Sequence, residues 1–104
     1  MNKRDIILMN APFTNLSEKK IRPALVLARI EDDLLICFIG SKKSKIDKYD
    51  IMIKADEVNE LRVDSVIKCN KIFTLHVSLS KGVLGKIPAK TYDTVVQRIE
   101  AIIR

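Results

Sequence analysis

Helical periodicity in this sequence is confined to its C-terminal end. Apolar residues recur there at the i, i+3, i+4, i+7 spacing of one helix face, at Tyr92, Val95, Val96, Ile99, Ile102 and Ile103. This stripe predicts one amphipathic helix with Thr91 as its N-cap. Parallel strands need long crossovers, which are usually helices, so a chain with one terminal helix has too little helix for a βαβ sheet.

The rest of the chain is typical of short strands separated by polar turns. The expected strands are 6–9, 21–30, 34–39, 51–53, 64–76 and 83–87. A break in alternation at Lys71 and Ile72 predicts a bend or bulge in the fifth of these strands. We also expect a hairpin turn at Asp32 and Asp33 and a single helical turn within residues 55–61. The pattern predicts a mainly β (α+β) fold, a small, partly closed barrel with a C-terminal helix, in one domain spanning residues 1–104.

Composition excludes several classes of protein. No apolar run approaches the roughly 20 residues that span a bilayer, and the first apolar run is too short for a signal peptide, so we expect a cytoplasmic protein without a membrane partner. Cys37 and Cys69 lie within apolar runs, which predicts buried thiols. Because the chain has one histidine, His76, and no CxxC motif, we expect no metal site and no cofactor.

The formal net charge is +6, and two stretches of the chain are rich in basic residues. The first holds Lys19, Lys20 and Arg22, and the second holds Lys42, Lys43, Lys45 and Lys48. Such stretches favour a polyanion or an acidic protein as partner. Arg22 begins an apolar strand, and Ser41 ends another. A guanidinium beside a hydroxyl has the chemistry to stabilise a phosphorane-like transition state.

Four segments carry a family resemblance in their order along the chain. They are "RDIIL…PFTNLSEKKIRPALVL", "ICFIGSKKSK", "DSVIKCNKIFTL" and "LGKIP", followed by the closing helix. The chain resembles the MazF/PemK endoribonuclease toxins of type II toxin–antitoxin modules. The resemblance implies an SH3-like barrel, a homodimer, an acidic antitoxin and metal-independent cleavage of single-stranded RNA. Attack by a ribose 2′-hydroxyl would leave 2′,3′-cyclic phosphate and 5′-hydroxyl ends.

The resemblance also implies roles for individual residues. The family's catalytic arginine, which precedes a proline, matches Arg22, and its threonine at the end of the third strand matches Ser41; a shift of one residue would place Gly40 there instead. PemK-type members carry an acidic general base where this chain has Asn70, and an amide cannot take up a proton. The residues expected to contact RNA are Lys19, Lys20, Lys42, Lys43, Lys45, Lys68 and Asn70.

Two alternatives to an active ribonuclease remain open on the sequence. Gyrase-poisoning toxins share the fold and depend on bulky apolar residues at the end of the closing helix. This chain ends Ala101-Ile102-Ile103-Arg104, which argues mildly against that class. The other alternative is a family member that binds RNA and does not cut it, which the presence of Gly40 and Asn70 favours.

Overall fold

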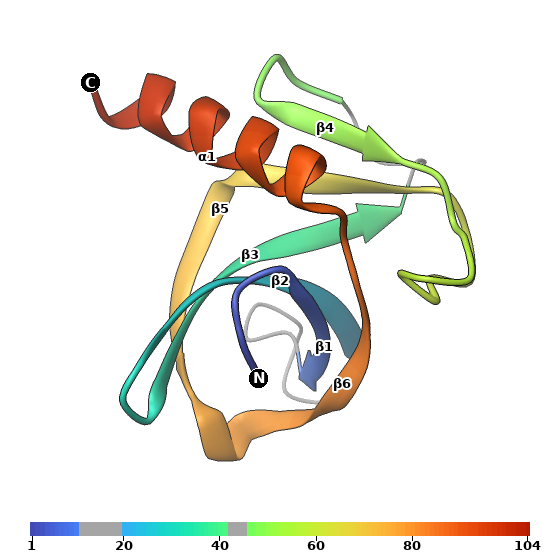
Figure 1. Ribbon diagram of the computed structural model, residues 1–104, viewed down its shortest axis with the longest axis vertical. Coiled ribbons are helices and arrows are strands. Elements are labelled where there is room, and N and C mark those ends of the chain that lie inside the picture. The colour runs from blue at the N-terminus through green and yellow to red at the C-terminus, as the bar shows by residue number, and fades with distance from the viewer. Residues whose placement is uncertain (11–19, 42–45) are drawn as a thin grey trace.

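The computed structural model describes residues 1–10, 20–41 and 46–104; residues 11–19 and 42–45 are outside the description (Figure 1). The described residues form six strands, a short 3₁₀ helix and one α-helix. Their bounds are β1 Asp5–Asn10, β2 Ile21–Ile30, β3 Asp33–Ser41, β4 Asp50–Ile53, β5 Ser65–His76, η1 Val77–Leu79, β6 Ser80–Lys86 and α1 Ala89–Ile103.

The strands make one antiparallel sheet in the order β4-β5-β3-β2-β1-β6. β4 and β6 are its two edges, so the sheet is open, and it curls in the manner of a barrel (Figure 1). The helix lies across β5 beside β4. These observations confirm the predicted mainly β architecture with a single C-terminal helix.

The sheet buries apolar side chains on both faces. The helix-side core contains Leu25, Cys37 and Ile39 together with Val95 of α1. The opposite core contains Ala24, Val26, Ile36 and Phe38, and the rings of Phe38 and Phe73 meet edge to face at 4.8 Å. Burial on both faces explains why β2 and β3 are continuous apolar runs rather than alternating ones.

The long strand β5 is bent, as the sequence predicts. Its pairing with β3 jumps from Cys37–Ile72 to Phe38–Lys68, so residues 69–71 form a bulge. On one side of the bulge β5 pairs with β4 and with the end of β3, and on the other side it pairs with the start of β3. The bend therefore lets one strand serve both parts of the curled sheet.

Several predicted boundaries differ from the structure; β6, for example, begins at Ser80 and not at residue 83. The N-cap of α1 is Pro88, not Thr91, and the Tyr92 N–H donates to the Pro88 carbonyl at 3.0 Å. Proline fits the start of a helix because it has no N–H to leave unpaired there. The hairpin turn is Glu31–Asp32, because Asp33 already pairs with Ile30.

The helix is fixed to the sheet by its apolar stripe and by polar contacts. The Tyr92 hydroxyl donates to the Leu27 carbonyl at 2.6 Å.

Both cysteines are buried free thiols, as predicted, and burial raises the pKa of Cys69 to about 11 and that of Cys37 further. In the part of the chain that the structure describes, no helix has the length and apolar character needed to cross a membrane.

Candidate functional site

The sheet divides at the end opposite the β2–β3 hairpin. The ladder between β2 and β3 stops at Ala24–Phe38. Beyond it, Arg22 pairs with Met9 of β1, whereas Ser41 pairs with Ser65 of β5. The two strand ends thus follow different neighbours, and a hollow of about 440 Å³ lies at this end of the sheet.

This Arg22 hollow contains both residues that the sequence predicts to be catalytic. Its polar and charged lining consists of Arg22, Ser41, Glu60, Arg62 and Ser65, and its remaining walls are mostly apolar. Among the described residues, the side chains of Arg22, Glu60 and Arg62 form no hydrogen bond or ion pair. The hollow therefore presents two guanidinium groups and one carboxylate that have no partner among the described residues.

Arg22 and Ser41 reach the hollow from different faces of the sheet. By strand alternation Arg22 shares the face of Ala24 and Val26, which belong to the opposite core. Ser41 shares the face of Cys37 and Ile39, which belong to the helix-side core. Both faces border the hollow because it lies at the strand ends, and Gly40 is the β3 residue on the face of Arg22.

A compact turn after β4 supplies Glu60 and Arg62. The buried Asn59 accepts from the Asp56 and Leu61 N–H groups, both at 3.0 Å, and its Nδ2 donates to the Lys54 carbonyl at 2.8 Å. The Glu60 N–H closes the turn onto the Asp56 carbonyl at 3.0 Å, an i to i+4 bond of the helical kind expected here. Side-chain capping from within the turn thus fixes its path.

Strand β6 holds this turn in place from outside. The Lys86 N–H donates to the Val58 carbonyl at 3.1 Å. At Gly85 a Cβ atom would lie 2.5 Å from backbone atoms of Asn59, so only glycine permits this approach. Glu60 itself has φ 54°, in the left-handed region of backbone conformation that residues other than glycine rarely adopt.

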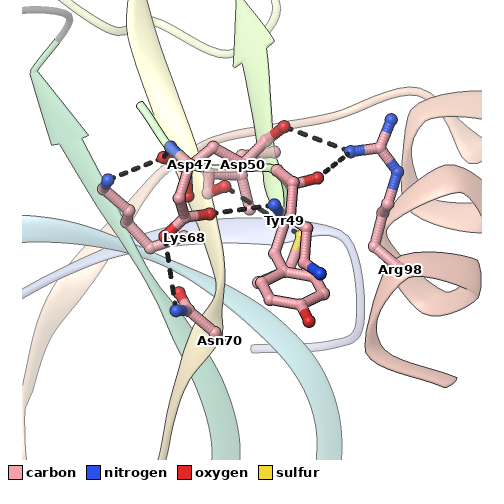
Figure 2. Close-up of polar contacts among 9 residues, drawn as sticks. Asp47, Tyr49, Asp50, Lys68, Asn70 and Arg98 are labelled. Carbon is pink, nitrogen blue, oxygen red and sulfur yellow. Dashed lines mark hydrogen bonds and ion pairs between the residues drawn. The ribbon is translucent and has the colours of Figure 1, made fainter. Parts of the chain in front are cut away.

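Lys68 and Asn70 belong to a different cluster, which we call the β4 anchor: Asp47, Asp50, Lys68, Asn70 and Arg98 (Figure 2). Lys68 Nζ lies 2.7 Å from Asp50 Oδ2, and the Asp50 side chain is fully buried. The other oxygen, Asp50 Oδ1, is buried without a hydrogen-bond partner in the described structure. Lys68 is therefore the cation that compensates a buried carboxylate.

The remaining members of the β4 anchor tie it to the loop before β4 and to α1. Asn70 Nδ2 donates to Asp47 Oδ2 at 3.4 Å, and Arg98 donates to the Lys48 and Asp50 carbonyls at 3.1 and 3.3 Å (Figure 2). A hydrogen bond from the Tyr49 N–H is the main cause that lowers the pKa of Asp47. Neither Lys68 nor Asn70 lines the Arg22 hollow.

The other lysines that are predicted to contact RNA lie close to Arg22 or Ser41 in the sequence. Lys20 is exposed and immediately precedes β2. Lys19, Lys42, Lys43 and Lys45 lie outside the described residues. Within the described ranges, no three His, Cys, Asp or Glu side chains gather in a way that could hold a metal ion.

Comparison with known proteins places the chain in a family. The model of the PemK-like, MazF-like toxins of type II toxin–antitoxin systems matches residues 2–103. The chain belongs to this family. No curated protein sequence matches it at a significant level.

Solved structures of MazF-type proteins share the fold. MazF from Deinococcus radiodurans superimposes with a TM-score of 0.78 at 18% identity, covering 99% of this chain and 96% of that one. Mycobacterium tuberculosis toxin MazF-mt6 gives 0.75 at 20% identity, with 96% of each chain covered. An endoribonuclease in complex with its cognate antitoxin, from a mycobacterial species, gives 0.75 at 10% identity and covers 99% and 94%.

The sequence reading of this PemK/MazF-like chain missed Glu60 and Arg62. They lie in a short polar stretch that matches no catalytic motif, and only the fold brings them to Arg22. The spacing of Asp56 and Asn59 was an available signal for a side-chain-capped turn. It would have predicted the turn but not the strand ends that the turn approaches.

Proposed function

We propose that this protein is an endoribonuclease toxin that cleaves single-stranded RNA at specific sequences without a metal ion. The 2′-hydroxyl attacks the adjacent phosphate, and the products carry 2′,3′-cyclic phosphate and 5′-hydroxyl ends. Family membership supports this class of activity. The observation that carries the proposal is that Arg22 and Ser41, from strands with different neighbours, line one hollow in which Arg22 has no protein partner among the described residues.

Arg22 is proposed to bind the scissile phosphate. Its planar guanidinium matches two phosphate oxygens and stays charged at every physiological pH. As the 2′-oxygen attacks, charge grows on those oxygens, and the interaction strengthens in the transition state. Ser41 is proposed to donate its hydroxyl to the same phosphate.

Lysines are proposed to guide the RNA backbone to this site. Lys19, Lys20, Lys42, Lys43 and Lys45 flank Arg22 and Ser41 in the sequence and supply a salt-dependent attraction. Lys68 and Asn70 are the weaker candidates, because each already has a partner in the β4 anchor.

The protein is further proposed to act as a homodimer that an acidic antitoxin neutralises. The net charge of +6 suits an acidic partner. The solved relatives include a complex of MazE and MazF from Deinococcus radiodurans and a mycobacterial endoribonuclease with its antitoxin.

The test is incubation of the purified, antitoxin-free protein with a mixed-sequence single-stranded RNA in EDTA, followed by mapping of the 5′ ends. Arg22→Ala is the test variant. Arg29→Ala is the matched control, since Arg29 is an exposed arginine at the other end of the same strand. Discrete cuts with 5′-hydroxyl ends that vanish in Arg22→Ala alone are expected.

Other outcomes would overturn the proposal. If RNA stays intact and gyrase–DNA cleavage complexes accumulate, the protein is a gyrase poison of the same fold. If RNA binds with salt-dependent affinity and stays whole, the protein is an RNA-binding member without activity.

A further inference from the structure

Transfer of the 2′-hydroxyl proton requires a base, and the expected position for one carries an amide. Asn70 cannot accept a proton, and its side chain is directed to Asp47 in the β4 anchor. Ser41 and Arg22 are weak bases at neutral pH, since a hydroxyl is a poor proton acceptor and a guanidinium is already protonated. The identity of the group that accepts this proton is an inference that rests on the proposed ribonuclease activity and adds a residue to its mechanism.

Among the described residues that line the Arg22 hollow, one carries a carboxylate. Glu60 lines the hollow together with Arg22, Ser41 and Arg62, and it forms no ion pair with either arginine. Glutamate is a common general base when it lies beside the reacting group.

The backbone at Glu60 is held in an unfavourable conformation by its surroundings. Its neighbours in the chain, Asn59 and Leu61, are 5% and 8% exposed, and both take part in the hydrogen bonds of the turn. This framework keeps Glu60 at φ 54°, where a glycine would be less strained. A strained residue that borders a cleft is a recurrent feature of functional sites.

We propose that Glu60 is the general base of RNA cleavage. The O2′–P bond forms as the P–O5′ bond breaks, and the electron pair of that bond goes to O5′. The hydroxyl proton passes to the Glu60 carboxylate, while O5′ takes a proton from water. Glu60 then releases its proton to the hydroxide that remains, which restores the carboxylate.

The test compares Glu60→Gln with Glu57→Gln on an RNA oligonucleotide that contains one mapped cut site. Glu57 lies on the same turn and lines a neighbouring hollow, which Glu60 and Arg62 also border, but it does not line the Arg22 hollow. Its variant therefore makes the same charge change on the same turn outside the Arg22 hollow. We expect kcat to fall about 100-fold or more in Glu60→Gln and to stay within threefold of wild type in Glu57→Gln. Circular dichroism and the thermal midpoint check that both variants fold.

The pH profile separates a base from a residue that only supports the site. Among the described residues, the charged groups that share a hollow with Glu60 are Arg22, Arg62, Asp56 and Glu57. The wild-type rate should fall at acidic pH, because a general base that is already protonated cannot accept the 2′-hydroxyl proton. That acidic limb should persist in Glu57→Gln and disappear in Glu60→Gln.

A second substrate separates a base from an acid. Replacing the bridging 5′ oxygen by sulfur gives a leaving group that needs no proton, so the defect of Glu60→Gln should persist on it. Equal rates for Glu60→Gln and wild type, an unchanged acidic limb, or rescue by the sulfur substrate would each overturn the assignment. A wild-type protein that leaves RNA whole would overturn the proposed function and, with it, this role of Glu60.

Discussion

The Arg22 hollow and the β4 anchor both contain charged side chains, but these are paired with one another in the anchor and, among the described residues, are not paired in the hollow. In the anchor, Lys68 compensates the buried Asp50, and Asp47 accepts from Asn70 and the Tyr49 N–H. In the hollow, Arg22 and Arg62 have no partner among the described residues. Charges that the fold has already paired are costly to separate, whereas charges that the described structure leaves unpaired on a concave surface are available to a ligand.

The largest expected effect is on activity at the hollow. Replacing Arg22 by alanine should lower cleavage by about 100- to 1,000-fold, because the charge that grows on the phosphate loses its main partner. The free energy of unfolding should change by less than about 0.5 kcal/mol, since the Arg22 side chain is exposed and forms no hydrogen bond or ion pair with the described residues. Cleavage assays and urea unfolding measure the two effects. A strongly destabilised Arg22→Ala would erase the contrast with the anchor.

The next effect is on stability at the anchor. Lys68→Met should destabilise the protein by about 3 kcal/mol, because the buried Asp50 carboxylate loses its cation. Lys71→Met is the matched control, since Lys71 is exposed on the same strand, and it should be near neutral. Urea unfolding gives both values. A Lys68→Met protein of wild-type stability with weakened RNA binding would assign Lys68 to the RNA surface instead.

A smaller effect should have the opposite sign. Glu60→Gly should stabilise the fold by up to about 1 kcal/mol, because glycine accepts the left-handed conformation at φ 54° without a Cβ clash. The same change at Glu57, which is not in that conformation, should destabilise the turn. Thermal unfolding measures both. A gain in stability together with a loss of cleavage would mark Glu60 as a residue retained for activity.

The smallest effect concerns the pH dependence of the anchor. The pKa of Asp47 is lowered in the folded state, mainly by the Tyr49 N–H, so the ionised carboxylate contributes stability above its ordinary pKa of 3.8. That contribution disappears as pH falls through the lowered pKa. Asp47→Asn should therefore be less stable than wild type at pH 7 and equal to it in strong acid. Thermal midpoints across this range test the sign, and a constant difference would exclude the carboxylate charge as its cause.

The fold could be predicted because its signals are local. The stripe from Tyr92 to Ile103 specified the helix, and the apolar runs specified β2 and β3. The site was only half predictable. Arg22 carries a motif, but Glu60 depends on a turn that reaches β6 through the Lys86 N–H, a contact between distant parts of the sequence.

The sequence also could not predict that Lys68 lies away from the Arg22 hollow. Lys68 was predicted to contact RNA, but a lysine on a strand fits either an RNA surface or a salt bridge. The choice depends on Asp50, which the register of β4 places directly opposite Lys68. A single sequence does not fix that register.

The contact between Gly85 and Asn59 has a consequence for protein synthesis. The turn that carries Glu60 is held by residues 85 and 86, which the ribosome adds long after the turn itself. A nascent chain that stops short of them has Arg22 and Ser41 but lacks the clamp that positions the rest of the hollow. The protein therefore completes its site only after β6 has been synthesised and has paired with β1.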